Sequence, residues 1–311
     1  MNEAKADVLQ GPRFVVDIKS SEYPRYLQEH PQAPKKIFCI GNIEACSVGL
    51  AVVGARKATP YGTSCAKRFS KLAAAQGISI ISGGALGCDS AAHSAALEAK
   101  GTTVAVLGGG CDCVYPKRNF KLFQDIIDTG GAVVSEWGWD VPPMPAFFRL
   151  RNRIIAGMAK ATLVVEAGLP SGTFVTADET LEIGREVLVV PGSISAPNSK
   201  GTNRLLYQGA IPIVDDESFL EILTTIFTRS ELQETPRACI DQMNSEEQAL
   251  LEDPLISALL AEPLSQEEIF TLAKTLCGHE TPSAWSAVRI ETAQNLGLIT
   301  RYPDGKYGVY C

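Results

Sequence analysis

The chain has 311 residues, of which 45% are hydrophobic, and a formal net charge of −7. No apolar run reaches the roughly 18 residues of a membrane span, and the first residues lack the apolar core of a signal peptide, which argues against a membrane protein. The nine cysteines are odd in number and several lie in predicted buried segments, so we expect reduced thiols in a globular, cytoplasmic protein.

The charge is unevenly distributed along the chain. Residues 1–44 carry six acids and six bases, residues 45–214 carry 12 acids and 16 bases, and residues 215–311 carry 17 acids and six bases. The corresponding net charges are 0, +4 and −11. The overall negative charge therefore conceals a basic central part, followed by an acidic tail.

The central part of the chain has the pattern of an α/β domain. Residues 1–44 contain a short amphipathic segment, 23–29, and one strand, 37–40, and we expect this extension to pack on the core. From 45 to 220, short β-branched runs alternate with helical patterns, which predicts a doubly wound parallel sheet. The predicted strands are 50–53, 78–81, 103–107, 132–135, 162–165, 187–190 and 211–214, and the predicted helices are 62–76, 90–99, 119–128, 152–159, 173–184 and 203–208.

The last part of the chain has the pattern of a small separate domain. Residues 221–250 are polar and predict a linker. In 251–311, a helix at 254–260 is followed by a second that opens with the capping box Ser265 to Glu268, and by a third from Thr281-Pro282 to Gly297. A hairpin, 298–302 and 306–310, completes the domain. Three helices followed by a hairpin predict a winged helix.

Two glycine loops point to a binding site. Gly83 and Gly84 follow the strand at 78–81, and the glycines at 108–110 follow the strand at 103–107. Glycine permits sharp turns and lets backbone N–H groups approach an anion closely. Because the carboxyl ends of parallel strands meet at one edge, where open α/β folds bind ligands, we expect a site at that edge.

Basic residues are placed to converge on the same edge. Three segments, 45–88, 141–165 and 187–214, contain no acid but several bases. Four bases that follow strands would form a positive pocket lined by glycine amides, which suits a polyanion: Arg56, Lys117, Arg149 and Arg151. The alternative, that Arg151 and Arg153 form salt bridges, is less favoured because the neighbouring sequence supplies no acids. Phe147 and Phe148 either pack in the core or stack on bases.

The usual nucleotide and hydrolase motifs are missing. Gly108-x-Gly110 is followed by Cys113 where a dinucleotide fingerprint has its third glycine, and no P-loop or Gly-x-Ser-x-Gly elbow occurs. The close pair Cys111-x-Cys113 has no second pair nearby, and the chain has only three histidines. We therefore expect neither a metal nor a cofactor.

Candidate acid–base residues have simpler structural interpretations. Asp89 and His93 lie four apart and could form an acid–base pair, but a helix-capping aspartate and a packed histidine are the favoured interpretation. Glu136 and Glu166 each follow a strand and could face a ligand, although structural caps are the commoner use. The sequence thus favours a binding site over a catalytic one.

A series of different short motifs lies between about residue 23 and residue 219, and their number and order form a specific pattern. They are Val53-Gly54-Ala55-Arg56, Ser82-Gly83-Gly84-Ala85-x-Gly87-x-Asp89-x-x-Ala92-His93, Tyr115-Pro116, Ser135-Glu136, Phe148-x-x-Arg151-Asn152-Arg153-Ile154-Ile155-Ala156-Gly157, Glu166-Ala167, Ser171-Gly172-Thr173-x-x-Thr176-Ala177, Gly184-Arg185, Pro191-Gly192 and Gly201-x-Asn203.

On these motifs the chain resembles the DprA/Smf family of DNA-processing proteins of natural transformation. The resemblance implies an extended Rossmann-like domain that binds single-stranded DNA in a positive pocket, forms a homodimer and helps to load a RecA-type recombinase, without being an enzyme. It implies that phosphates are held by Arg56, Lys117, Arg151, Asn152 and Arg153, that backbone donors come from Gly83, Gly84, Gly172 and Thr173, and that the DNA site also includes Ser82, Phe148, Arg149, Thr176 and Asn203.

The chain departs from the family pattern in three places. Cys88 stands where an aliphatic residue is usual, the N-terminal helical domain of some members is missing or reduced to a remnant, and the predicted winged helix is acidic. Its acidity favours a protein contact over DNA binding by that module.

Two other functions remain open. The fold is also similar to that of nucleotide phosphoribohydrolases, whose loop resembles Pro170-Ser171-Gly172-Thr173, although Thr176 takes the place of their working glutamate. A nucleotide-sensing module that signals through the acidic tail is the third possibility.

Overall fold

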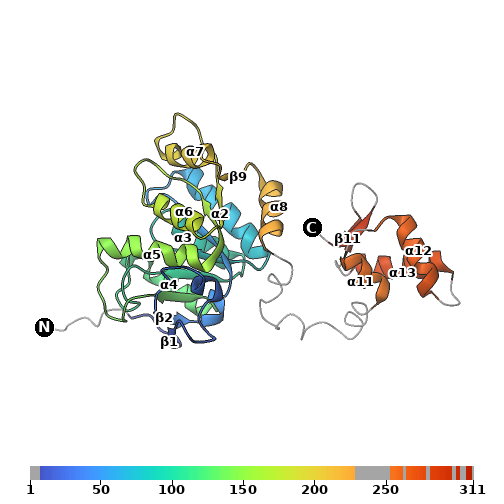
Figure 1. Cartoon of the computed structure of the whole chain (residues 1–311), viewed down its shortest axis with the longest axis horizontal. Coiled ribbons are helices and arrows are strands. Elements are labelled where there is room, and N and C mark those ends of the chain that lie inside the picture. The colour runs from blue at the N-terminus through green and yellow to red at the C-terminus, as the bar shows by residue number, and fades with distance from the viewer. Residues whose placement is uncertain are drawn as a thin grey trace. The chain divides into compact units, whose positions relative to one another are not determined.

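A computed structural model of the chain divides into two compact units, Met1–Thr235 and Pro236–Cys311. The structure describes residues 8–227, 253–261, 264–277, 281–295, 299–301 and 306–309. The first unit is built on a nine-stranded sheet, and the second on helices and a two-stranded sheet (Figure 1).

The sheet of the first unit has the strand order β1-β2-β6-β5-β4-β3-β7-β8-β9. Strands β3 to β9 are parallel, whereas β2 is antiparallel to both β1 and β6. The predicted doubly wound parallel sheet is therefore confirmed, and the N-terminal extension contributes two strands where one was predicted. The strands are β1 (Arg13–Asp17), β2 (Lys36–Gly41), β3 (Gly49–Val53), β4 (Ser79–Ser82), β5 (Thr103–Val106), β6 (Ala132–Ser135), β7 (Ala159–Val164), β8 (Glu186–Val189) and β9 (Ile211–Pro212).

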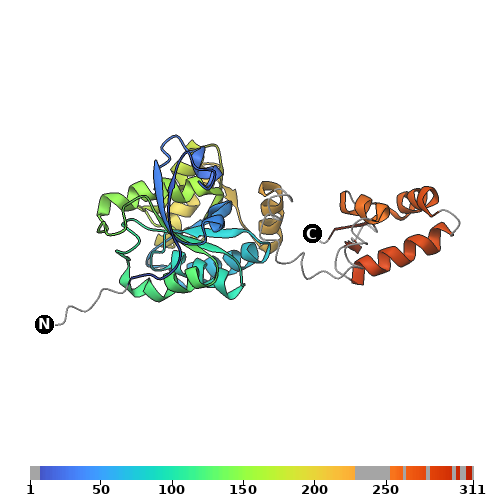
Figure 2. The same ribbon diagram turned by 90° about the horizontal axis from the view of Figure 1, so that it is seen from below.

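Helices cover both faces of this sheet (Figure 2). In β3, alternate residues point to opposite faces, so that Ala51 and Val53 join one core cluster while Leu50 and Val52 join the other. Full burial of a side chain of this size contributes about 1.5–3 kcal/mol. One face packs against α1 (Arg25–Gln28), α5 (Pro145–Met158), α6 (Thr173–Glu182) and α7 (Lys200–Tyr207), and the other against α2 (Pro60–Ala75), α3 (Cys88–Glu98), α4 (Phe120–Asp128) and α8 (Asp216–Ile226). Three short 3-10 turns, η1 (Ile43–Cys46), η2 (Lys117–Asn119) and η3 (Pro197–Ser199), lie in the connections.

The path of the chain through the sheet opens a crevice beside β3. From β3 the chain moves outward to β4, β5 and β6, and then returns to β7 on the other side of β3. The connections that leave the carboxyl ends of β3 and β7 therefore run in opposite directions. Such a switch point is where open α/β sheets bind their ligands.

Two helices differ most from the sequence-based expectation. Helix α5 begins at Pro145, seven residues before the predicted start, because a proline fits the first helical position even though the preceding segment looks like a loop. Helix α8 covers residues 221–226, which were assigned to a linker. It begins with a capping box between Asp215 and Ser218, and it buries Phe219 against Phe69, with ring centroids 4.9 Å apart.

The second unit contains the predicted elements in the predicted order. They are α11 (Pro254–Ala261), α12 (Gln266–Leu276), α13 (Pro282–Asn295), β10 (Ile299–Arg301) and β11 (Tyr307–Val309). The capping box is confirmed, because Ser265 Oγ accepts from the Glu268 N–H and Glu268 Oε2 from the Ser265 N–H. Gly297 and the hairpin turn lie outside the described residues, and the assignment as a winged helix stays a prediction.

The thiols of Cys111 and Cys113 contact different parts of the chain. The buried Cys111 thiol faces Phe38 and Val133 carbonyls, whereas Cys113 donates to the Asp140 carbonyl at 3.2 Å. Within the described ranges, no group of histidine, cysteine and acidic side chains is arranged to hold a metal ion. In the same ranges, every helix is too short or too polar to cross a bilayer.

Candidate functional site

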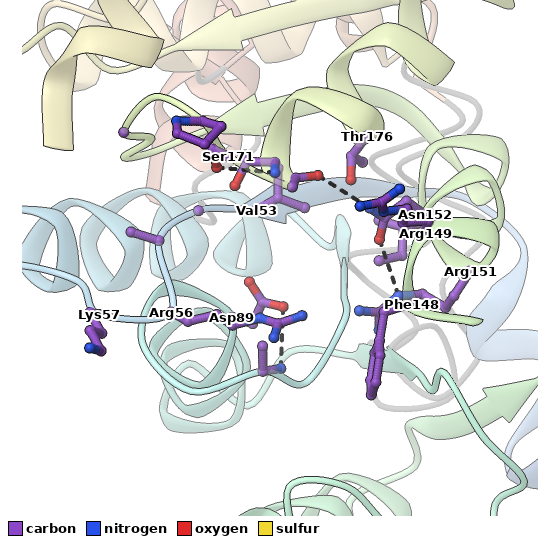
Figure 3. A pocket seen from close by; sticks show the side chains of 18 of the residues that line it. Val53, Arg56, Lys57, Asp89, Phe148, Arg149, Arg151, Asn152, Ser171 and Thr176 are labelled. Carbon is purple, nitrogen blue, oxygen red and sulfur yellow. Dashed lines mark hydrogen bonds between the residues drawn. The ribbon is translucent and has the colours of Figure 1, made fainter. Parts of the chain in front are cut away.

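A cavity of about 690 Å³ lies at the switch point (Figure 3). Its lining comes from the loops that follow β3, β4, β5, β7 and β8, from α5, and from the starts of α3 and α6. The charged side chains that line it are four bases and one acid, namely Arg56, Lys57, Arg149, Arg151 and Asp89. The cavity is therefore positive, as expected from the sequence.

Arg151 forms part of the cavity wall and also joins three elements of the fold. Its side chain is buried, and its Nη1 donates to the Gly83 carbonyl at 2.7 Å and to the Val106 carbonyl. Burial lowers the pKa of Arg151 to about 10, against the opposing effect of Asp89. The guanidinium thus connects α5 to the ends of β4 and β5.

Gly83 makes this arrangement possible. A Cβ at position 83 would lie 2.5 Å from both terminal nitrogens of Arg151, closer than a real Cβ contact. The guanidinium therefore lies flat against the backbone of the β4 loop. This close approach, rather than a positive φ, explains the glycine.

Asp89 does not cap its helix as predicted. Helix α3 begins at Cys88, one residue before Asp89 and two before the predicted start. The Asp89 carboxylate turns back to accept from the Ala85 N–H at 3.2 Å. The residue is only 6% exposed, and burial raises its pKa while Arg151 and Arg56 act to lower it. Asp89 therefore fixes the β4 loop beside the two arginines.

His93 does not form an acid–base pair with Asp89. It is completely buried, its Nδ1 lies 2.7 Å from Thr103 Oγ1, and it does not line the cavity. Because the Thr103 hydroxyl donates to the Ile80 carbonyl, Nδ1 must carry the proton. The favoured interpretation, a packed histidine, is correct.

Both glutamates that follow strands have structural roles. Glu166 accepts from the Thr59 N–H at 2.9 Å and from the Thr59 hydroxyl at 2.7 Å, and so fixes the start of α2. Glu136 accepts from Arg153 Nη2 at 2.6 Å in a largely buried ion pair. Neither lines the cavity.

The ion pair corrects the expectation that Arg153 lacks an acidic partner. Its partner comes from the loop that follows β6, and its Nε also donates to the Gln32 carbonyl at 2.8 Å. Only 7% of Arg153 is exposed. Arg153 therefore connects α5 to the N-terminal extension and does not line the cavity.

Aromatic and basic side chains meet at the cavity wall. The Arg56 guanidinium lies 5.5 Å from the centre of the Phe148 ring, and the centres of the Tyr115 and Phe148 rings are also 5.5 Å apart. Phe148 and Tyr115 both line the cavity, and about half of Tyr115 is exposed. The sequence analysis missed Tyr115 as a site residue, although an aromatic two positions before Lys117 in a loop after a strand was an available signal.

The start of α6 supplies polar groups opposite the arginines. Asn152 Nδ2 donates to the Gly172 carbonyl at 3.3 Å, and the Thr173 N–H donates to Ser171 Oγ at 3.2 Å. Thr176 is 2% exposed, and Figure 3 shows its hydroxyl directed into the cavity. The dipole at a helix N-terminus favours an anion there.

The remaining predicted residues do not line the cavity. Ser82 Oγ donates to the Val52 carbonyl at 2.6 Å, and the Gly84 carbonyl accepts from Asn119 Nδ2 at 2.9 Å. Asn203 exchanges hydrogen bonds with the Gly192 backbone, and Lys117 is exposed in η2. The structure gathers eight of the predicted residues in the cavity: Arg56, Phe148, Arg149, Arg151, Asn152, Gly172, Thr173 and Thr176.

Comparison with known proteins gives one consistent family. Residues 14–224 match the family model described as DNA recombination-mediator protein A. The chain is 43% identical to the protein Smf of Escherichia coli over 215 residues, which are 69% of this chain and 58% of that protein. It is 39% identical to the DNA processing protein DprA of Streptococcus pneumoniae over 203 residues, 64% of this chain and 70% of that protein.

Solved structures agree with these matches. The structure of DprA from Streptococcus pneumoniae has a TM-score of 0.62 at 36% identity, covering 68% of this chain and 74% of that one. DprA from Helicobacter pylori, whose single-stranded DNA binding mode that structure describes, has a TM-score of 0.63 at 28% identity, covering 69% and 97%. The match spans less than two thirds of the Smf proteins of Escherichia coli and Synechocystis, at 58% and 55% of their lengths.

Proposed function

Because the chain belongs to the DNA recombination-mediator protein A family, we propose that it binds single-stranded DNA in the switch-point cavity. The observation that carries the proposal is the charge of the cavity. Arg56, Lys57 and Arg149 are exposed at its walls, and none has an ion-pair partner among the described residues. The one acid, Asp89, is bound to backbone and faces Arg151. Free cations in this position attract phosphates.

The aromatic side chains favour a single strand over a duplex. Phe148 and Tyr115 offer ring faces beside Arg56, and only unpaired bases can stack on them. The volume of about 690 Å³ lies in the range that holds nucleotide-sized groups. Phosphates would then meet the arginines and the start of α6, while bases meet the rings.

The proposal also includes a recombinase as the partner protein and a homodimer as the oligomeric state. The family description as a recombination mediator supports a role in which the bound strand passes to a recombinase. We propose that this recombinase is of the RecA type, and that the protein acts in the cytoplasm as a homodimer. Strand exchange by a purified recombinase, with and without this protein, tests the first part. Light scattering on the purified protein tests the second.

The main test measures DNA binding directly. Fluorescence anisotropy of a labelled single strand and of its duplex, at two salt concentrations, should give tighter binding to the single strand. The logarithm of the affinity should fall against the logarithm of the salt concentration with a slope of about −0.7 per phosphate contacted. Binding without salt dependence would refute a phosphate site.

A matched pair of variants locates the site. Arg56→Ala with Arg149→Ala removes two exposed cavity cations and should abolish most of the affinity, whereas Lys67→Ala with Lys71→Ala removes two exposed charges from α2 and should not. Arg151 is unsuitable for this purpose because its side chain holds Gly83 and Val106 in place. Equal losses in both variants would contradict binding in the cavity.

We propose that the cavity is a binding site and not a catalytic one. The loop Pro170 to Thr173 lines the cavity as it would in a phosphoribohydrolase, but the position of the working glutamate is occupied by Thr176. Glu166 is engaged by Thr59 and lies outside the lining. Incubation with nucleoside monophosphates should release no free base, and calorimetry should show that affinity grows with oligonucleotide length, unlike that of a nucleotide sensor.

A further inference from the structure

A buried carboxylate outside the cavity lies at the start of α2. Glu166 is 3% exposed, and it accepts from the Thr59 N–H at 2.9 Å and from the Thr59 hydroxyl at 2.7 Å. Thr59 is the N-cap of α2, and its hydroxyl oxygen also accepts from the Gly62 N–H at 3.1 Å. A Cβ at position 62 would lie 2.8 Å from the Glu166 Cδ, so the carboxylate packs directly on the first turn of the helix.

This carboxylate takes the position of a bound anion. Within the described ranges no basic side chain pairs with Glu166, so the groups that stabilise its charge are the Thr59 donors and the dipole at the start of α2. Helix α2 follows β3, the first of the parallel strands, and in nucleotide-binding α/β sheets a phosphate binds at the start of the corresponding helix. Here a side chain of the protein itself occupies that place.

The same contact fixes the loop that carries two of the cavity cations. Only residues 54–58 separate the end of β3 from Thr59, and they include Arg56 and Lys57. Both side chains are exposed and line the cavity (Figure 3). Because β3 holds one end of the loop and Glu166 holds the other, the placement of these two cations depends on the carboxylate.

The backbone that carries Glu166 is itself fixed beside β3. Glu166 is the second residue after β7, and the preceding Val165 N–H donates to the Val53 carbonyl at 3.0 Å, which continues the pairing of β7 with β3. Two other hydrogen bonds reach the middle of the loop, from the Cys88 N–H at 3.2 Å and from the Asn198 side chain at 3.3 Å. Both are longer than the two hydrogen bonds that Glu166 accepts at its end.

We propose that Glu166 is a positioning residue for DNA binding. It does not touch the strand. Its carboxylate serves as an internal anion at the start of α2 and so holds Arg56 and Lys57 where they meet phosphates. The proposal rests on the proposed function, because it assigns the residue that orders two cations of the same site.

The test uses the opposite signs of the charge effect and the positioning effect. Loss of an acid makes the protein more positive, which by itself should strengthen binding to DNA. For Glu166→Ala we expect the reverse, because two phosphate contacts are lost. Affinity for a labelled single strand should fall about 25-fold at 0.1 M salt, and the salt slope should become shallower by about 1.4. Arg56→Ala with Lys57→Ala should give the same two values.

Combined variants separate positioning from a loss of stability. Glu166→Ala added to Arg56→Ala with Lys57→Ala should cause no further loss of affinity, because its effect passes through these two side chains. Glu166→Gln keeps the shape of the side chain and an acceptor oxygen, so it should lose less affinity in the same direction. It gives the same comparison where the alanine variant does not fold. All affinities are measured well below the unfolding temperature of each variant.

Glu136→Ala is the matched control. It also removes a largely buried acid that follows a strand, but the partner of Glu136 is Arg153 on α5 and not the loop after β3. This variant should keep the affinity and the salt slope of the wild type. An equal loss in Glu136→Ala and Glu166→Ala would show a general effect of losing a buried acid, and it would overturn the proposal.

The remaining outcomes distinguish this proposal from the binding function itself. Unchanged or tighter binding by Glu166→Ala refutes the positioning role, while DNA binding in the cavity stands. The same holds if Glu166→Ala causes its full loss in the protein that already lacks Arg56 and Lys57. If the wild type binds no single strand, the proposed function fails, and the positioning role fails with it.

Discussion

Replacing Gly83 by alanine should destabilise the first unit by displacing Arg151. The new Cβ would lie 2.5 Å from Nη1 and Nη2 of Arg151 and 2.6 Å from its Cζ, so the guanidinium must leave its place. Its hydrogen bonds to the Gly83 and Val106 carbonyls are then lost, and Asp89 loses the adjacent buried charge. A hydrogen bond that involves a charged group contributes about 1.5–3 kcal/mol, so the loss of both costs about 3–6 kcal/mol.

Thermal unfolding measures this cost. For a unit of this size, a loss of that magnitude lowers the Tm by roughly 10 °C. Gly172→Ala is the matched control, because it also lies on the cavity wall but no atom lies within 4 Å of its added Cβ. It should change stability by less than about 1 kcal/mol. A Gly83→Ala protein as stable as Gly172→Ala would refute the role assigned to Arg151.

Two further predictions concern the buried histidine and the exposed tyrosine. Burial lowers the pKa of His93 from 6.5 to about 3 and Nε2 has no partner in the described structure, so between these pH values the unfolded chain binds a proton that the folded chain does not. The free energy of unfolding should therefore fall as pH decreases from 6.5 towards 3, by up to about 1.4 kcal/mol per pH unit. Chemical denaturation of His93→Gln should show a pH dependence without this component. The same pH dependence in the variant and the wild type would contradict the prediction. Tyr115→Ala should weaken single-strand binding about fivefold or more while Tyr115→Phe keeps it, as measured by anisotropy, and an equal loss in both would indicate a role for the hydroxyl rather than the ring.

The strands of the sheet could be predicted from the sequence because they are short, rich in β-branched residues and bounded by glycine. The start of α5 could not be predicted, because the prolines and aromatic residues before residue 149 suggested a loop. That error had a consequence for the site. Successive residues of a helix turn by about 100°, so Arg151 and Arg153 point to nearly opposite sides, one to the cavity and the other to Glu136.

Long-range partners explain what local patterns could not predict. Asp89 stands before an alanine-rich run, where a helix cap is the normal use, yet its surroundings are set by Arg151 and Arg56 from distant segments. Glu136 pairs with Arg153 only because the loop after β6 folds beside α5. Charge counted along the sequence therefore identified the positive edge but not which bases remain free at it.

The cavity is assembled from segments that lie far apart in the chain, from Arg56 to Asn198. No fragment that ends before the β8–α7 connection can contain the complete site, and long-range contacts of this kind form late in folding. A chain still emerging from the ribosome therefore lacks the complete cavity. The proposed binding site is assembled only when the segments from Arg56 to Asn198 have all been made.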